Sequence, residues 1–379
     1  MKYLPLVVKN LLRKKTRTLL TVLSIAVALF LYGLLVTIHG AFYQGVEMAG
    51  ADRLVVRNRT SLIMPLPISY KERMLQIDGV AEVAHATWFG GVYQDERNFF
   101  VQFAIEPEPY LRMYPEFVIS KVQLAEFMRD RESCLAGRKL VERFGWKVGD
   151  RIPIKGTIWP GVWEFNLRAI YDGKRPEDDT TQFMFRYDYL DERRQFGQGT
   201  VGWYMVKVKN PDDSGKICRA IDTRFANSPY ETVTEPEKVF MTGFVKQMGN
   251  IELLILSIGA VVLFTLLLVT GNTMAMAVRE RIGEIGVLKT VGFSDRAVLV
   301  LVLGESMTIA GIGGIIGIGL AKLFTLGGDP THGFLPVFYF PPAKIVWGLI
   351  LATAVGLASG LVPAVGAMRL KIVDALRRV

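Results

Sequence analysis

Long runs of apolar residues alternate along the chain with segments in which charged and apolar residues are mixed. There are four such runs: Leu19–Ile38, Leu253–Val278, Ala297–Ala321 and Ile345–Met368. Only the third contains a charged residue, Glu305. A helix needs roughly 20 residues to cross the hydrocarbon layer of a membrane. The pattern therefore predicts four membrane-spanning helices. The first run is longer than the apolar part of a usual signal peptide, and no small-residue cleavage site follows it, so we expect it to remain as an anchor.

The long segment between the first two runs has the pattern of a water-exposed domain. Alternation of apolar and polar residues predicts strands at 52–59, 80–93, 99–105, 151–154, 163–170 and 203–208. Helical spacing predicts helices at 70–76, 135–144 and 211–225. The expected fold is a membrane α-helical protein with four transmembrane helices and a large α+β extracytoplasmic domain inserted between helices 1 and 2. The expected domains are residues 1–44 with an amphipathic N-terminal helix and the first span, 45–249 outside the cytoplasm, and 250–379 with the other spans.

The charge distribution predicts which side of the membrane each segment occupies. Residues 1–18 carry six Lys/Arg and no acid, whereas 39–252 carry 29 Lys/Arg and 30 Asp/Glu. The connection 279–296 has four Lys/Arg, 322–344 has two, and the segment after the last span has four. Basic residues collect in short cytoplasmic loops. We therefore expect a protein of the bacterial inner membrane. Both termini and residues 279–296 would lie in the cytoplasm, and residues of about 39–252 would lie outside the cytoplasm. Because the net charge of +9 sits beside apolar runs, nucleic-acid binding is not expected.

Segments next to the first and second spans have helical spacing of their own. Residues 4–12 place Leu4, Val7 and Leu11 on one face. This spacing predicts an amphipathic helix on the inner membrane surface, or else a basic anchor that only sets the topology. Residues 240–252 continue with helical spacing into the second span. We therefore expect one rigid helix over 240–278 that could act as a lever.

Motifs for nucleotide, metal or nucleophilic chemistry are absent from the sequence. There is no G-x-x-x-x-G-K-S/T stretch to bind ATP, no H-E-x-x-H and no G-x-S-x-G. The histidines His39, His85 and His332 are too scattered to suggest a metal site. We expect no catalytic activity and no bound cofactor in this chain. Cys134 and Cys218 both fall in the exported segment, where a disulfide is an open alternative but unpaired thiols are favoured.

Small residues in the third and fourth spans are spaced for close helix packing. Gly313 and Gly317 are four residues apart, and so are Gly356 and Gly360. Such spacing lets helix backbones approach each other closely. Glu305 is the one ionisable residue well inside a span, which makes it a candidate proton or cation site. No second acid or histidine lies in the spans, so a hydrogen-bonded carboxyl at a helix interface is the favoured interpretation.

The connection between the second and third spans reads R-E-R-I-G-E-I-G-V-L-K-T-V-G-F-S over residues 279–294. Written as a helix, it brings Arg281 within reach of Glu284 and places Ile282 and Ile285 on one face. A charged, partly apolar helix at the rim of a membrane can dock a soluble partner, or it can be a solvated connection. Spacing alone leaves both interpretations open.

This segment resembles the E-R-x-x-E-I-G-x-L-K-x-x-G signature of the MacB/FtsX-like permeases, the mechanotransmission class of ABC transporters that includes LolC and LolE. The matching residues are Glu280, Arg281, Glu284, Ile285, Gly286, Leu288, Lys289 and Gly292. Three further stretches resemble the same family: the basic entry 10–21 to the first span, residues 134–155, and the C-terminal end with Pro363, Ala364, Ala367 and 374–377. Ile372 departs from the pattern, because relatives often carry proline there.

The resemblance implies the permease subunit of an ABC transporter. A separate ABC ATPase subunit would bind ATP and Mg²⁺ and dock in the cytoplasm. The residues implied in coupling to it are Arg279, Glu280, Arg281, Glu284, Ile285, Leu288, Lys289, Ala375, Leu376 and Arg377. A second permease copy, identical or related, would complete the unit, and a periplasmic adaptor or outer-membrane channel could join it. The exported domain would then move and drive export or extraction of a lipid, lipoprotein, peptide or drug, without a channel of cargo size through the membrane lipid.

Three functions of other classes stand as alternatives. An FtsX-like signal transmitter would control an extracytoplasmic cell-wall hydrolase without moving cargo. A hydrolase bound in stoichiometric amounts would favour it, whereas an aromatic lipid-binding groove would favour transport. A proton-coupled transporter needs more intramembrane charge than Glu305 provides. A membrane-tethered enzyme needs a catalytic cluster within 45–249, and the sequence shows none.

Overall fold

The computed structural model divides the chain into two compact units. Unit 1 comprises residues 1–40, 250–328 and 339–379, and unit 2 comprises 41–249 and 329–338. The structure describes residues 13–98, 100–175, 178–247, 250–328 and 337–371, together with Leu6, Asn10, Leu11, Pro330 and Leu335. Most of the amphipathic segment predicted at 4–12 and the whole of 374–377 therefore lie outside the described residues.

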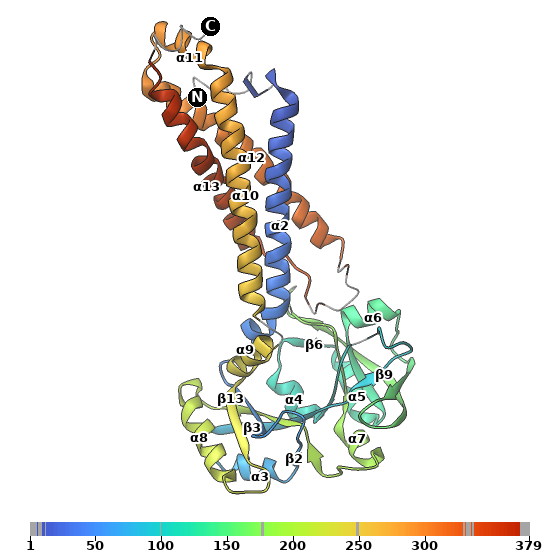
Figure 1. The fold of residues 1–379 in the computed structure, drawn as a ribbon. Helices are drawn as coiled ribbons and strands as arrows, with labels where there is room; N and C mark the ends of the chain where they lie inside the picture. The colour runs from blue at the N-terminus through green and yellow to red at the C-terminus, as the bar shows by residue number, and fades with distance from the viewer. Residues whose placement is uncertain are drawn as a thin grey trace. The chain divides into compact units, whose positions relative to one another are not determined.

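Unit 1 is a bundle of helices. Its long helices are α2 (Lys15–Met48), which continues into unit 2, α10 (Ile251–Glu280), α12 (Asp295–Leu326) and α13 (Pro342–Met368), and the short helix α11 (Ile282–Thr290) follows α10 (Figure 1). Each long helix has an apolar stretch long enough to cross a membrane. The side chain of Ser294 accepts a hydrogen bond from the N–H of Ala297 and so caps the start of α12. The predicted fold, four spans with an α+β domain between the first and the second, is confirmed.

Glycines allow close packing within the bundle. At each of the four positions noted in the sequence, an added Cβ would lie less than 3.0 Å from an atom of a neighbouring helix. For Gly317 that atom is the carbonyl oxygen of Ala26 in α2, at 2.3 Å. For Gly360 it is the Cβ of Ser306 in α12, at 2.7 Å. Glycine at these positions therefore lets α2 and α13 approach α12 more closely than any larger residue would.

The predicted continuous helix over 240–278 is wrong. Helix α9 (Glu237–Gln247) lies in unit 2, and α10 begins separately at Ile251. Asn250 is not helical, with φ −80° and ψ 67°, and its side chain accepts a hydrogen bond from the N–H of Leu253. A side chain that caps the first free N–H groups marks the start of a new helix. Apolar spacing on both sides of Asn250 hid this start signal.

Unit 2 is built on a sheet of 11 strands (Figure 1). The strand order is β13 (Thr232–Pro236), β1 (Arg53–Asn58), β12 (Trp203–Val208), β3 (Val80–Trp88), β5 (Val101–Ile105), β10 (Gln182–Arg186), β7 (Ser133–Gly137), β9 (Gly161–Gly173), β8 (Arg151–Gly156) and β4 (Gly91–Val92), with β6 (Phe117–Ile119) on β9. The pairs β5–β10 and β7–β9 are parallel. Strands β2 (Leu66–Pro67) and β11 (Thr200–Val201) form a second, two-stranded sheet.

Short helices connect these strands. They are α3 (Tyr70–Leu75), α4 (Pro107–Met113), α5 (Lys121–Arg129), α6 (Arg138–Phe144), α7 (Tyr187–Arg193), a 3₁₀ turn (Pro211–Asp213) and α8 (Ser214–Phe225). The predicted strands at 52–59, 151–154 and 203–208 are confirmed, and so is a helix within 211–225. The predicted helix over 135–144 is wrong in its first part, because residues 133–137 form the fully buried strand β7. A short strand buried on both faces has no alternation to distinguish it from a helix.

Both cysteines lie in the interior of unit 2 as free thiols. Cys134 is in β7 and Cys218 is in α8, and neither forms a disulfide. Burial raises the pKa of the Cys218 thiol to about 11 and that of Cys134 well above its ordinary value. The unpaired state favoured from the sequence is therefore confirmed, and both thiols are held in the unreactive protonated form.

A buried ion pair joins the first strand of unit 2 to its last helix. Arg53 at the start of β1 donates from Nε to Glu237 at the start of α9, at 2.6 Å, and its Nη2 lies 3.0 Å from Glu116. Glu237 also accepts from the hydroxyl of Tyr114 and the N–H of Gly50, each at 2.9 Å. Burial opposes the charge on Arg53, but attraction to Glu237 outweighs it and raises the pKa of Arg53. We call Arg53, Glu237, Glu116 and Tyr114 the buried clamp.

Candidate functional site

Helix α11 lies between the end of α10 and the start of α12. Arg281 stands between α10 and α11 with φ −113° and ψ 17°, and interrupts the helix there. Gly292 follows α11 with φ 106°, a conformation that favours glycine, and the chain then enters α12 at Asp295. Ile285 is buried in the same apolar cluster as Val298 of α12, and Leu288 lines a small cavity together with both. Apolar packing therefore holds one side of α11 on the bundle.

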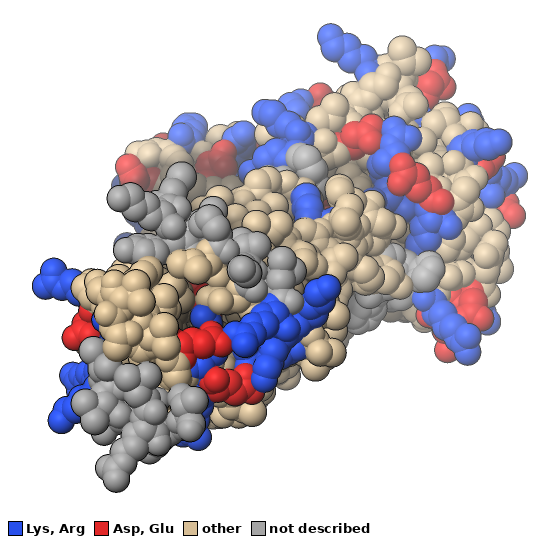
Figure 2. All heavy atoms as spheres, turned by 90° about the horizontal axis from the view of Figure 1, so that it is seen from above, with Lys and Arg blue, Asp and Glu red and all other residues tan. Residues whose placement is uncertain are grey.

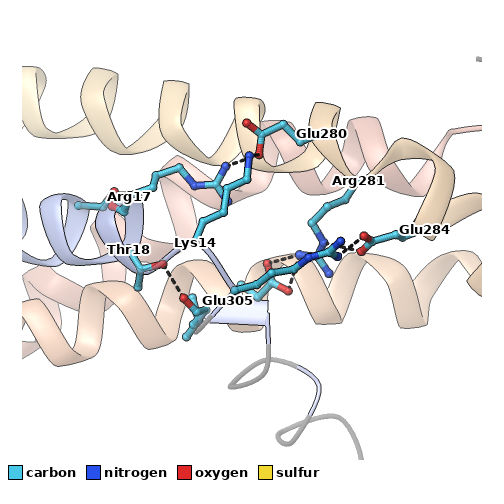
Figure 3. Close-up of polar contacts among 10 residues, drawn as sticks. Lys14, Arg17, Thr18, Glu280, Arg281, Glu284 and Glu305 are labelled. Atoms are coloured by element: carbon cyan, nitrogen blue, oxygen red, sulfur yellow. Dashed lines mark hydrogen bonds and ion pairs between the residues drawn. The ribbon is translucent and has the colours of Figure 1, made fainter. Parts of the chain in front are cut away.

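Charged and polar side chains meet around the start of α11, and they come from α2 and the residues just before it, from the α10–α11 junction, from α11 itself and from α12. We call them the charged cluster: Asn10, Arg13, Lys14, Arg17, Glu280, Arg281, Glu284 and Glu305 (Figure 3). Arg281 is at its centre. Its Nη1 donates to both carboxylate oxygens of Glu305 in α12, at 2.9 Å each, and its Nε lies 3.3 Å from Glu284 in α11. The i+3 contact between Arg281 and Glu284 expected from the sequence is confirmed, and Glu305 is an additional partner.

Glu305 is buried, with 5% of its surface exposed. Besides Arg281 it accepts a hydrogen bond from Nδ2 of Asn10 at 2.6 Å. A carboxylate whose oxygens are already paired with a guanidinium and an amide has little capacity left for a transported ion. The geometry therefore supports the interpretation of Glu305 as a paired carboxyl at a helix interface.

The start of α2 is tied to the α10–α11 junction by surface ion pairs. Glu280 accepts from Arg17 at 2.7 Å and lies 2.8 Å from Lys14, and Glu284 pairs with Arg13. Partial burial opposes the charge on Glu284, but hydrogen bonds from Arg13 and Arg281 outweigh it and hold the pKa of Glu284 below its ordinary value. Each exposed pair contributes little alone, about 0–1 kcal/mol. Together they fix where α2 lies against α11.

Lys289 ties α11 to the end of α13. Its Nζ donates to the carbonyl oxygens of Met368 and Leu370, at 2.6 and 2.8 Å, and lies 2.7 Å from Asp295. The carbonyl groups at the end of a helix lack partners within the helix and carry a partial negative charge, so a lysine there stabilises the helix end. Separate contacts thus bind α11 and its junction with α10 to the residues at the start of α2, to α12 and to the end of α13.

Several residues proposed for coupling are occupied within the chain. Ile285 faces the bundle, Lys289 caps α13, and Arg279 is exposed in the last turn of α10. Ala375, Leu376 and Arg377 lie outside the described residues. Val287 in α11 and Val291, the residue that follows its end, are 52% and 75% exposed, and neither is among the residues that the sequence implied in coupling. Their i, i+4 spacing within a short charged helix was the available signal.

The polar side chains of the charged cluster are engaged in ion pairs and hydrogen bonds. The described residues contain no group of three or more His, Cys, Asp or Glu side chains arranged to hold a metal ion. The charged residues near α11 are ion-paired to one another or bonded to helix ends. These contacts attach α11 and its junction with α10 to neighbouring parts of unit 1.

Comparison with known proteins gives one family match and several relatives. Residues 256–372 match the family described as FtsX-like permease C-terminal. An uncharacterized ABC transporter permease, MJ1507 of Methanocaldococcus jannaschii, is 23% identical over 97% of this chain and 96% of its own length. YvrN of Bacillus subtilis, also an uncharacterized ABC transporter permease, is 39% identical over 28% of this chain. The macrolide export ATP-binding/permease protein MacB of Vibrio parahaemolyticus is 33% identical over 60% of this chain. The chain spans only 25% of YvrN and 36% of that MacB.

Two solved structures are similar to part of the chain. The periplasmic region of MacB from Actinobacillus actinomycetemcomitans matches with a TM-score of 0.38 and 10% identity, over 52% of this chain and 95% of that chain. The extracellular domain of the transporter YknZ from Gram-positive bacteria matches with a TM-score of 0.35 and 10% identity, over 48% and 99%.

Proposed function

Residues 256–372 match an FtsX-like permease domain, and the chain resembles an ABC transporter permease over nearly its whole length. From this premise we propose that the chain passes the motion of a separate ATPase subunit to unit 2. The observation that carries the proposal is the attachment of α11 and its junction with α10 to the residues at the start of α2, to α12 and to α13. A push on the exposed side of α11 would move these three helices together. Of these, α2 leads directly along the chain into β1 of unit 2.

The cargo is proposed as a lipid, lipoprotein, peptide or drug that is exported or extracted on the outer side of the membrane. Support comes from the relatives, of which MacB is named for macrolide export. A second permease copy would complete the transporter. If the purified chain instead carries a cell-wall hydrolase in stoichiometric amounts and moves no cargo, the role would be that of a signal transmitter.

We further propose that both termini and α11 lie in the cytoplasm and that unit 2 lies outside. The excess of Lys/Arg in residues 1–18 and in the short connection 279–296 supports this orientation. Single cysteines placed at Arg59 and Tyr230, after replacement of the two native cysteines by serine, are expected to react with an impermeant thiol reagent in whole cells. A cysteine at Val287 is expected to react only after the membrane is opened. Labelling at Val287 from outside would overturn the orientation.

Val287 and Val291 are the proposed anchors for the ATPase. Replacing both by aspartate (Val287→Asp with Val291→Asp) is expected to weaken co-purification of the ATPase with the chain at least thirtyfold. Central apolar anchors of an interface commonly contribute about 2 kcal/mol or more when removed, and an unpaired charge in a desolvated contact adds to the loss. Affinity purification in mild detergent, with the bound ATPase quantified by mass spectrometry, measures the effect.

A matched control uses the same substitutions at equally exposed valines of unit 2. Val162 and Val122 are 56% and 74% exposed, so Val122→Asp with Val162→Asp introduces the same charges at sites of similar exposure. This control should retain the ATPase at the wild-type level. Wild-type amounts of ATPase, with normal coupled hydrolysis, on the α11 variant would refute docking through Val287 and Val291.

A further inference from the structure

An open groove of about 800 Å³ runs between α2 and α10 at the end of unit 1 where α2 begins and α10 ends. Basic residues line one part, and hydroxyl and apolar residues line the rest: Arg13, Lys14, Lys15, Thr16, Arg17, Leu20, Thr21, Ser24, Val269, Thr273 and Met276. Both helices are among the four that are long and apolar enough to span a membrane. The groove therefore faces the zone where lipid headgroups meet acyl chains.

The basic part of the groove has more positive than negative charge. Arg13 pairs with Glu284, while Lys14 and Arg17 share Glu280. Glu284 is itself shared with Arg281. Lys15 is exposed and makes no ion pair with any residue that the structure describes. Figure 2, a view from above, shows Lys and Arg side chains gathered next to Asp and Glu side chains. The groove thus presents unneutralised positive charge.

The remainder of the groove needs no polar ligand. The hydroxyls of Thr21, Ser24 and Thr273 donate to backbone carbonyls one turn earlier in their own helices, at 2.8 to 2.9 Å. Apart from Thr16, the side chains that are left to contact a ligand are apolar, and Leu20 and Met276 are 60% and 50% exposed. A positive region that continues into an apolar wall matches a molecule with an anionic head and a hydrocarbon tail.

We propose that this groove binds an anionic phospholipid, with the phosphate among Arg13, Lys15 and Arg17 and an acyl chain along Leu20, Val269 and Met276. Basic pockets between membrane helices bind anionic headgroups in this way. A second copy of the chain fits less well. Twofold symmetry would bring the same basic residues face to face, and like charges across an interface repel. The inference depends on α2 and α10 spanning a membrane, and it is independent of ATPase docking.

The test is lipid retention by the full chain. The protein is purified in mild detergent from membranes, incubated with equal amounts of phosphatidylglycerol and phosphatidylcholine, and examined by native mass spectrometry. The wild type is expected to retain phosphatidylglycerol preferentially. Lys15→Gln should lower that retention about fivefold, since a basic residue near the lipid surface contributes about 1 kcal/mol. Val269→Trp should lower the retention of phosphatidylglycerol further, because the larger side chain would fill the apolar part of the groove.

Two controls make the same changes elsewhere in unit 1. Arg296→Gln removes an exposed basic residue in the first turn of α12, and Val300→Trp enlarges a 53% exposed valine that does not line the groove. Both should retain phosphatidylglycerol like the wild type. The proposal is overturned by equal retention of the two lipids, or by unchanged retention in Lys15→Gln and Val269→Trp. The proposal also fails if glycerol 1-phosphate displaces phosphatidylglycerol as effectively as the lipid itself does. It fails as well if Val269→Trp dissociates a dimer of the chain and leaves lipid retention unchanged.

Discussion

Replacing Glu237 by alanine is expected to destabilise unit 2 by about 3–5 kcal/mol. The change leaves Arg53 in a site where only 5% of its surface is exposed, without its 2.6 Å partner. A guanidinium removed from water and deprived of its counter-charge keeps its desolvation cost without the compensating attraction. Glu116 remains at 3.0 Å, so the loss falls short of that for a fully isolated charge. The hydroxyl of Tyr114 and the N–H of Gly50 also lose their acceptor.

Hydrogen–deuterium exchange on the full chain measures this effect locally. Amides in β1 and α9 should exchange roughly a hundredfold or more faster in Glu237→Ala, because about 1.4 kcal/mol corresponds to each tenfold change. The clamp joins the strand that follows α2 to the helix that precedes α10, so its loss should also reduce any ATP-driven response of unit 2. Unchanged exchange in β1 and α9 would show that the clamp does not hold these elements together.

Two matched variants separate the buried pair from charge loss in general. Glu108 pairs with Arg112 at 2.7 Å but is 73% exposed, so Glu108→Ala should cost no more than about 0.5 kcal/mol. Replacing both members of the clamp pair, Arg53→Met with Glu237→Leu, should restore much of the stability, because apolar residues of similar volume commonly substitute for a buried ion pair. A double variant no more stable than Glu237→Ala would mean that the loss arises from packing rather than from the unpaired charge.

The second large effect is expected for Glu305→Gln in the bundle. The amide is nearly the same size as the carboxyl but carries no charge, so Arg281 would lose the counter-charge that two 2.9 Å contacts supply. Removal of one member of a buried ion pair commonly costs about 3–5 kcal/mol. Arg281 connects Glu284 of α11 to Glu305 of α12, so loss of the Glu305 charge should loosen the attachment of α11 to α12. We expect a lower thermal unfolding temperature in detergent and uncoupled hydrolysis by the bound ATPase.

Asp295→Asn is the control for this variant. Asp295 pairs with Lys289, but its side chain is 67% exposed, and Lys289 keeps its two carbonyl acceptors. The change should therefore alter the stability by no more than about 1 kcal/mol. If Glu305→Gln unfolds like the wild type but abolishes proton-dependent transport, Glu305 would be an ion site and the pairing argument would be wrong.

Local pattern in the sequence was sufficient for the membrane part of the fold. An uncharged run of about 20 residues in lipid must satisfy its own backbone hydrogen bonds, which a helix does within the segment. The positions of α2, α10, α12 and α13 therefore followed from hydrophobicity alone. The Gly-x-x-x-Gly spacing likewise pointed to close packing, since a missing side chain leaves room whichever helix approaches. Alternation identified β1, β8 and β12 for the same local reason.

Other features depend on parts of the chain that are distant in sequence. Strand β7 is buried on both faces, so its residues show no period that a local pattern could reveal. The break before α10 depends on one capping side chain, Asn250, within otherwise helical spacing. The outward position of Val287 and Val291 became visible only when α12 was seen to cover Ile285 on the inner side of α11.

By itself, the sequence determined that this protein has four spans, an α+β insertion and a charged helix at the rim of the membrane, because each depends on neighbouring residues. The tertiary structure alone decided which charges meet. Arg281 finds Glu305 24 positions away, and Arg53 finds Glu237 184 positions away. Composition is compatible with many such pairings. Only the folded chain brings two particular side chains within 3 Å and excludes water from them, and that exclusion gives a charge pair its large effect.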